Sequence, residues 1–252
     1  MPPHPISVVI ITLNAADQLP GCLESVPFAD EILIVDSGST DQTGQIAEKF
    51  GARVLKQSWL GFGPQKQFAV AQAKNPWVLC LDADEAVDET LAASLQKEIE
   101  NPGYLAYRMA RRNRFMGRWL GHGEGYPDEK LRFFHRDHAQ WSREPVHEEV
   151  VTEKAVGRLQ GEIRHRSEEG LESYLAKQNR YTTVQAEALV ASGKKISPRH
   201  LLLSPPARFI KFYILRRGVL DGLPGFVHCM IGAFSSFLKY AKALSLVREK
   251  TG

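Results

Sequence analysis

The chain has 252 residues and a formal net charge of +3, from 32 Lys and Arg against 29 Asp and Glu. This length allows one large domain, or one domain with a helical appendage, and so small a positive charge is too weak to indicate nucleic-acid binding by itself. Three scattered cysteines, Cys22, Cys80 and Cys229, favour buried thiols in a reducing compartment over a disulfide framework. Residues 1–5 lack a charged leader followed by an apolar stretch, so we expect no secretion.

The first third of the chain alternates strand and helix patterns. Apolar runs at 6–14, 31–41 and 77–82, with a shorter one at 52–56, predict strands; 19–26, 43–50 and 65–73 read as helices, and 61–64 as a loop. This alternation predicts an α/β fold of Rossmann-like type, with a mostly parallel sheet and helices on both faces. Ligands are then expected at the carboxyl ends of the strands.

Residues 77–85 consist of an apolar run that is followed directly by three carboxylates. Asp82 and Asp84 form an Asp-x-Asp at the strand end, which can coordinate a divalent cation and, through it, a nucleotide diphosphate. The alternative is a strand-to-helix turn in which Asp84 or Asp88 caps the next helix. Strand-end turns at Thr12 to Asn14 and at 36–41 favour the ligand site.

These features resemble the family 2 glycosyltransferases of the GT-A fold, in which the same elements follow in this order. The segments at 35–41, 81–85, 146–148, 174–181 and 217–222 are similar to the bacterial lipopolysaccharide-core β-1,4-glucosyltransferases within that family. The likeness covers nearly the whole chain. It departs from many members at Ser37, where they carry a second acidic residue after the position of Asp36.

The resemblance implies roles for donor and metal binding. The predicted donor contacts are Thr12, Asn14, Asp36, Ser37, Lys66, Asp82 and Lys177. The predicted ligands of Mg²⁺ or Mn²⁺ are Asp84 and Asp82, because hard cations prefer oxygen ligands. His165 is a third predicted ligand, because it ends a strand where several GT-A enzymes have a late metal or phosphate contact. For Asp41, a cap of the following helix is as good an explanation as ligand contact. His147 is expected to be structural.

An inverting transfer needs a carboxylate that removes the proton of the acceptor hydroxyl. Glu148 follows the strand predicted at 131–134 and occupies the place where this family usually has its base, so we prefer it. Asp128 precedes that strand and is the alternative base, an acceptor contact, or a turn residue.

The segment with Arg108, Arg111, Arg112, Arg114 and Arg118 also contains Phe115 and Trp119. Arginines with aromatics suit single-stranded nucleic acid, a phosphorylated acidic oligosaccharide, or a charged connecting loop. The family resemblance favours the sugar acceptor, with Arg112, Arg114 and Trp119 as its contacts.

Beyond the strands predicted at 105–110, 131–135 and 162–165 and a helix at 170–191, the C-terminal region changes character. We expect a GT-A domain at 1–195 and an amphipathic helical region at 196–252. The charge-free window between Asp221 and Lys239 is interrupted by Pro224 and is short for a membrane span. Apolar stretches flanked by cations favour helices lying on an anionic membrane surface, or helices packed on protein.

The resemblance therefore implies a metal-dependent, inverting hexosyltransferase at the cytoplasmic face of the inner membrane. It is expected to move glucose from UDP-glucose onto the lipopolysaccharide inner core, or to act on another surface glycan or lipid-linked acceptor. A sugar nucleotidyltransferase is a weak rival, because the turn after the first strand lacks a glycine-rich basic phosphate loop. Nucleotide-sugar or nucleic-acid binding without turnover is the non-enzymatic alternative.

Overall fold

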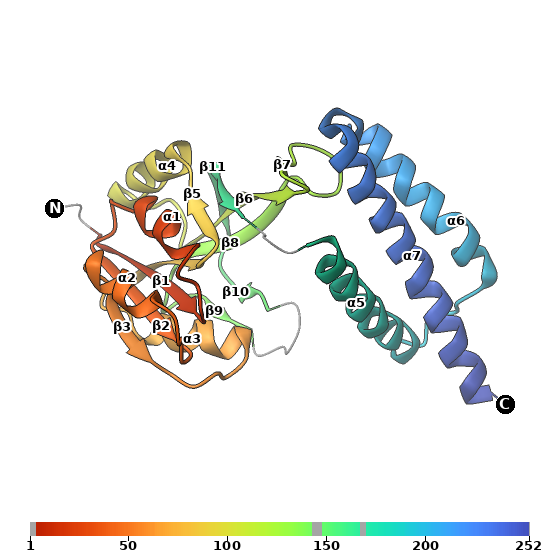
Figure 1. Cartoon of the computed structure of the whole chain (residues 1–252), viewed down its shortest axis with the longest axis horizontal. Helices are drawn as coiled ribbons and strands as arrows, with labels where there is room; N and C mark the ends of the chain where they lie inside the picture. The colour runs from red at the N-terminus through yellow and green to blue at the C-terminus, as the bar shows by residue number, and fades with distance from the viewer. Residues whose placement is uncertain (1–3, 143–147, 167–169, 252) are drawn as a thin grey trace. The chain divides into compact units, whose positions relative to one another are not determined.

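The computed structural model describes residues 4–142, 148–166 and 170–251, with side chains up to residue 249. The chain divides into two compact units (Figure 1): Met1–Arg111 with Asp128–Arg166, and Arg112–Pro127 with Ser167–Gly252. The boundary expected at residue 195 differs from this division. Helix α5 (Leu171–Ala191) belongs with the C-terminal helices, because it packs along α7 (Gly222–Thr251).

The first unit is built on a large sheet. Its strands are β1 (Ile6–Thr12), β2 (Glu31–Asp36), β3 (Arg53–Lys56), β4 (Trp77–Asp82), β5 (Glu85–Val87), β6 (Ala106–Phe115), β8 (Asp128–His135) and β11 (Gly157–His165). Their order in the sheet is β3-β2-β1-β4-β8-β6-β11-β5. Pairing is parallel from β3 to β4 and antiparallel in the β4–β8, β8–β6 and β11–β5 pairs. A separate antiparallel pair is formed by β9 (Gln140–Trp141) and β10 (Val150–Val151).

Helices cover both faces of this sheet, as the sequence predicted. They are α1 (Leu19–Glu24), α2 (Thr43–Lys49), α3 (Phe62–Gln72) and α4 (Glu89–Glu100). Alternate residues of β1 point to opposite faces: Val8 packs in one core cluster with Leu19 and Leu91, whereas Val9 packs in the other with Val70. The first cluster holds α1, α2 and α4, and the second holds α3, β9 and β10.

Local chemistry sets the helix ends. Gly51 follows the C-cap of α2 with φ at +73°, a left-handed conformation that glycine adopts without strain at a helix end. The predicted loop at 61–64 is wrong for most of its length, because α3 begins at Phe62. Pro64 lies in the first turn of that helix, where its missing N–H costs no intrahelical bond. Asp88 caps α4 by accepting from the Leu91 amide at 2.8 Å.

The second unit is mainly helical. It contains β7 (Arg118–Trp119), which pairs with the end of β6, and then α5, α6 (Pro198–Phe209), the π-helical turn η1 (Ile210–Leu215), the 3₁₀ turn η2 (Gly218–Asp221) and α7. Both α5 and α6 pack along α7. Lys242 links α7 to α5, because its ammonium donates to the Asn179 side chain at 2.6 Å and to the Thr182 hydroxyl at 2.9 Å. The C-terminal helical region predicted from the sequence is therefore present.

The segment Gly218–Glu249 is long and apolar enough to cross a membrane, judged by length and composition only. Its mean hydropathy is 1.2 and 33% of the apolar window is buried within the structure. A helix at the core of a soluble protein passes the same test, so this is weak support for a span. The exposed large apolar side chains of α7 follow helical spacing and are Leu223, Phe226, Met230, Phe234 and Phe237.

Candidate active site

Parallel pairing brings the predicted strand-end residues to one edge of the sheet. Thr12 is in register with Asp36 on β2, and Ile11 is in register with Asp82 on β4. The turns that follow β1, β2 and β4 therefore lie next to one another at their carboxyl ends. This is the edge where open α/β sheets bind ligands.

Asp36 organises the turn after β2. Its carboxylate accepts from the Thr12 hydroxyl at 2.9 Å, from the amides of Gly38 and Ser39 at 3.0 and 2.9 Å, and from the Ser39 hydroxyl. Burial raises the pKa of Asp36, but these hydrogen bonds outweigh burial and hold that pKa below its ordinary value. A carboxylate has about four acceptor positions, and the protein's own donors use them all. These four hydrogen bonds fix Asp36 in the turn, and its predicted donor contact stays a prediction.

Asn14 joins the first two strand-end turns. It adopts φ of +50°, and its side-chain oxygen accepts from the Thr40 amide at 2.8 Å. Its own backbone amide donates to the Ser39 hydroxyl at 2.8 Å. Asp41 accepts from the Thr43 amide at 3.0 Å and from the Ala16 amide at 3.1 Å. The N-cap of α2 is Gln42, so Asp41 supports the helix start from one position before the cap, and its predicted place as the cap itself differs by one residue.

Ser37 lies beside α3. Its hydroxyl accepts from the buried Gln65 side chain at 3.1 Å, and the same amide nitrogen donates to the Gln57 carbonyl at 3.2 Å. The Gln65 oxygen accepts from the Leu60 amide at 3.2 Å. Gln65 thus links the turn after β2, the segment after β3 and the start of α3.

Lys66 is buried, with 4% of its surface exposed, so it is not an ordinary surface lysine. Its ammonium lies 3.0 Å from Asp82 Oδ1 and 3.2 Å from Glu148 Oε1. The other oxygen of Asp82, Oδ2, accepts from Arg132 at 3.1 Å. Burial raises the pKa of Asp82, but Arg132 and Lys66 outweigh burial and hold it well below its ordinary value. Asp82 is therefore committed to two cations.

Glu148 reaches this cluster from the segment between β9 and β10. The close approach depends on Gly63 of α3, because a Cβ there would overlap the carbonyl oxygen of Ser142 and would lie 3.4 Å from the Glu148 Cβ. The predicted base and the Asp-x-Asp are thus brought together through Lys66. His147, which precedes Glu148, lies outside the described residues.

Asp84 pairs with the other predicted metal ligand. Its Oδ2 lies 3.0 Å from His165 Nε2, and its carbonyl accepts from the Arg166 amide at 2.9 Å. In residues 4–142, 148–166 and 170–251, no three His, Cys, Asp or Glu side chains gather as a ready-made metal site. Magnesium and manganese often use one or two protein ligands and complete their shell with phosphate oxygens and water. The Asp84 carboxylate fits that pattern, whereas the His165 imidazole would add a nitrogen ligand, which hard cations favour less.

Asp128 lies in a second ion-pair group on the same sheet. Arg111 bridges it at 2.7 Å to the fully buried Glu85 at 3.1 Å. Burial raises the pKa of Asp128, but Arg111 and Lys130 outweigh burial and lower it below its ordinary value. A general base works best with a pKa near the operating pH, so this environment suits Asp128 poorly for that role.

The arginine-rich segment is not the loop that the sequence suggested. It continues strand β6 to Phe115 and turns back into β7, with Arg114 opposite Trp119. Arg112 lies over the ring of Tyr126 at 4.9 Å, and Arg114 donates to the Gly117 carbonyl at 3.4 Å. These three predicted acceptor contacts, and the predicted donor contact Lys177 on α5, belong to the second unit. Their roles stay predictions.

Sequence reasoning missed four residues that build the site. They are Arg132, Trp141, Glu85 and Gln65. The Arg132 guanidinium carbon lies 5.0 Å from the Trp141 ring centre, and the ammonium of the predicted residue Lys66 lies 4.8 Å from it. Trp141 donates to the Cys80 sulfur at 3.4 Å. Glu85 accepts from the Asp82 amide, and Gln65 acts as described above. For Arg132, the sequence offered one signal: an arginine within an otherwise apolar run at 131–134.

Comparison with known proteins identifies the family. The model of the family described as Glycosyl transferase family 2 matches residues 7–158. The lipopolysaccharide core biosynthesis glycosyltransferase LpsC of Rhizobium meliloti (strain 1021) is 34% identical over 257 residues, which cover 96% of this chain and 93% of that protein. An uncharacterized glycosyltransferase of Rickettsia felis is 36% identical over 269 residues, covering 97% and 92%. The chain belongs to glycosyltransferase family 2.

A solved structure supports the fold assignment. Glucosyl-3-phosphoglycerate synthase from Mycobacterium tuberculosis, crystallised with Mn²⁺, UDP and glucosyl-3-phosphoglycerate, is similar with a TM-score of 0.50. The match covers 77% of this chain and 82% of that one at 17% identity, so it concerns the fold alone. The predicted GT-A fold with a C-terminal helical region is confirmed.

Proposed function

We propose that this glycosyltransferase moves a hexose, glucose from UDP-glucose, onto the lipopolysaccharide inner core with inversion at the anomeric carbon. The relative LpsC, named for lipopolysaccharide core biosynthesis, aligns over nearly the whole of both chains, which supports the acceptor class. The similar synthase structure contains UDP and Mn²⁺, which supports a uridine diphosphate donor and a divalent metal.

Asp84 and His165 would hold the metal, since their side chains meet at 3.0 Å at the strand-end edge. When bound, Mg²⁺ or Mn²⁺ would act as a Lewis acid that stabilises the leaving nucleoside diphosphate. Asp82 pairs with Lys66 and Arg132. Its role would be to hold these two cations at the carboxyl edge of the sheet, where the donor would bind. Asp36 and Asn14 would hold the strand-end turns in the shape that receives the nucleoside.

The observation that carries the proposal is the bridge from Asp82 through Lys66 to Glu148. It supports Glu148 as the base, because the bridge holds this carboxylate near the Asp-x-Asp. The anomeric carbon of the donor would lie close to that motif. Glu148 would accept the proton of the acceptor hydroxyl while the hydroxyl oxygen attacks that carbon and the bond to the diphosphate breaks. Lys66 acts as a positioning residue in this step.

A lipid-anchored acceptor places the reaction at the cytoplasmic face of the inner membrane. The exposed stripe on α7 supports this location, since Leu223 is 66% exposed and Phe234 54% exposed. Large apolar side chains left in water along one helix face are typical of membrane or protein contact.

The test is transfer from UDP-glucose to detergent-solubilised inner core by the purified protein, with Mg²⁺ or Mn²⁺ and with a chelator. We expect transfer only with metal. Glu148→Gln should lower the transfer rate by about 10²–10⁴-fold, the usual contribution of a general base. UDP-glucose binding should persist in this variant, because Glu148 acts on the acceptor.

The matched control is Glu149→Gln, which makes the same change at an exposed neighbour and should keep the wild-type rate. Asp128→Asn separates the two candidate bases. If Glu148→Gln retained full activity while Asp128→Asn abolished it, the base would be Asp128. The anomeric configuration of the product, read by NMR, decides between inversion and retention.

A further inference from the structure

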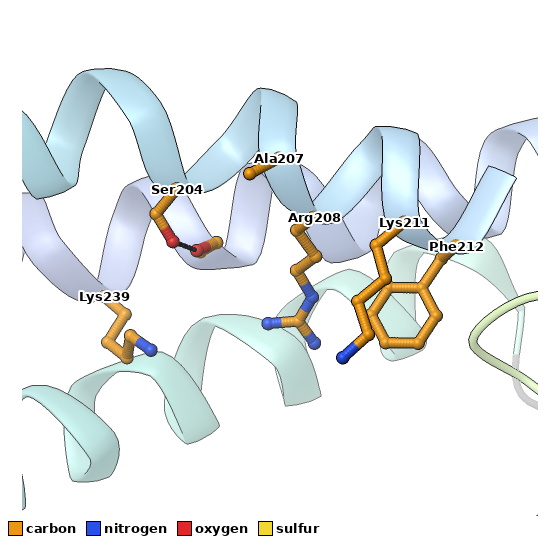
Figure 2. Close-up of a pocket in the computed structure, with 7 residues that line it drawn as sticks. Ser204, Ala207, Arg208, Lys211, Phe212 and Lys239 are labelled. Atoms are coloured by element: carbon orange, nitrogen blue, oxygen red, sulfur yellow. Dashed lines mark hydrogen bonds between the residues drawn. The ribbon is translucent and has the colours of Figure 1, made fainter. Parts of the chain in front are cut away.

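The helical unit carries a pocket of about 420 Å³ between α6 with η1 and α7. This volume is within the range of small-molecule sites. Figure 2 shows the side chains of Arg208, Lys211 and Lys239 extending to the same side of their helices. Two residues that carry hydroxyl groups, Ser204 and Ser236, also line it.

The pocket has an excess of positive charge. Arg208 forms an ion pair with Glu124. Lys211 and Lys239 form no ion pair within the described part of the chain; their ammonium groups lie 5.2 Å from the Phe212 ring centre and 4.5 Å from that of Tyr240. Three cations against one carboxylate leave a net charge of +2 at the opening.

The donors suit a phosphate group. Arg208 offers a planar fork of N–H groups, and the two lysines add point charges from another direction. The hydroxyls of Ser204 and Ser236 are 2.7 Å apart. One hydroxyl donates to the other, so one proton remains for a ligand oxygen. A tetrahedral anion with several acceptor oxygens matches this set better than a single carboxylate.

Apolar side chains beside the pocket indicate what carries the phosphate. Leu203, Ile210 and Ile214 are 66%, 49% and 58% exposed on α6 and η1. Leu203 is four residues before Ala207, which lines the pocket, and Ile210 is three residues after it, so both are neighbours of Ala207 on the helix surface. A soluble phosphate needs no such apolar surroundings, whereas a phosphate on an acylated glycerol brings its chains to them.

We propose that this pocket binds the phosphate headgroup of an anionic membrane lipid and so holds the enzyme on the membrane surface. The inference rests on the proposed function in one respect, because an acceptor anchored in a membrane makes lipid binding useful. The binding itself needs neither donor nor acceptor.

The experiment measures co-sedimentation of the full chain with vesicles of phosphatidylcholine, with or without phosphatidylglycerol. The pocket variant is Lys211→Gln with Lys239→Gln, which leaves the pair between Arg208 and Glu124 in place. Each cation near an anionic surface contributes about fivefold, so the double variant should bind the anionic vesicles about 30-fold more weakly. The control with the same charge change is Lys194→Gln with Lys195→Gln, at exposed residues after α5.

We expect the control to keep most of the binding, and short-chain phosphatidylglycerol to compete where inorganic phosphate at equal ionic strength does not. Equal losses in both double variants would overturn the pocket, because surface charge alone would then explain binding. Equal competition by inorganic phosphate would overturn the lipid assignment. The co-sedimentation experiment contains no donor or acceptor. Its outcome therefore tests the lipid site even if the transfer assay shows no activity.

Discussion

At the scale of single residues, the site depends on cations that hold carboxylates in place. Lys66 reaches both Asp82 and Glu148, and Arg132 holds the second oxygen of Asp82. The motif at 82–84 was evident from the sequence, as was the candidate base. The sequence assigned Asp84 to the metal and Asp82 to the donor or the metal, but it did not show that Lys66 and Arg132 hold Asp82. The partners that separate Asp82 from Asp84 come from strands and helices remote in the chain.

Asp82→Asn should lower the free energy of unfolding by about 3 kcal/mol at neutral pH, since it leaves Lys66 and Arg132 partly uncompensated. The pKa of Asp82 is lowered in the folded protein, so its ionisation stabilises the fold above the ordinary aspartate pKa. The gap between wild type and variant should stay constant above about pH 5. It should narrow as the pH falls below about 3.9, where the unfolded chain binds the proton first.

Urea unfolding across this pH range checks the prediction. Asp137→Asn is the control, because the Asp137 side chain is 70% exposed and should leave unfolding unchanged within about 0.5 kcal/mol. A gap between wild type and Asp82→Asn that did not change with pH would show that lost packing, not ionisation, explains the loss.

At the scale of elements, most strands and helices could be predicted because their apolar periodicity is local. The strands at 6–12, 31–36 and 77–82 and the helix at 171–191 are close to the predicted ones. Elements were mispredicted where a residue type that is unusual in a strand or helix is stabilised by partners far away in the chain. Strand β6 continues for five residues beyond the predicted strand, to Phe115, because Arg111 is neutralised by Asp128 and Glu85. A run of arginines looks like a loop until its partners are known.

Asp88 links two elements, since its Oδ1 caps α4 at the Leu91 amide and also accepts from the Glu162 amide of β11 at 3.1 Å. Asp88→Ala should lower the free energy of unfolding by about 1–2 kcal/mol, because it removes a helix cap and leaves a strand amide unsatisfied. Asp88→Asn keeps an acceptor oxygen and should recover most of this loss. Thermal and urea unfolding measure both variants. Equal losses in the two would show that the negative charge, not the cap, is what matters.

At the scale of the whole molecule, the chain consists of a sheet unit with the strand-end site and a helical unit with the apolar stripe and the cationic pocket. Residues 112–127 leave the first unit between two of its strands and join the helices. A boundary drawn along the sequence cannot represent such an excursion. Asp221 secures it in the second unit by accepting from the amides of Gly121 and His122 at 3.0 and 2.8 Å.

UDP-glucose with Mn²⁺ should stabilise the protein through the sheet unit. At a ligand concentration of about 100 times Kd, binding adds about 2.7 kcal/mol to the free energy of unfolding, which corresponds to a rise in Tm of about 5–10 °C. Removal of the metal with a chelator should abolish most of this rise. Differential scanning fluorimetry measures it, and hydrogen exchange should show the added protection in residues 4–111, 128–142 and 148–166. Protection confined to the helical unit would contradict the proposed donor site.

The sequence alone determined the family, the GT-A fold and the order of its binding turns. Each strand and the polar residues at its end are neighbours in the chain, so a local pattern is enough to identify them. It also named the carboxylates of the site. Only the tertiary structure decided which of them are held by cations, that Asp36 is saturated by its own turn, and that Arg132, Trp141 and Gln65 belong to the site. Those facts depend on contacts between residues far apart in the chain, and no local pattern carries them.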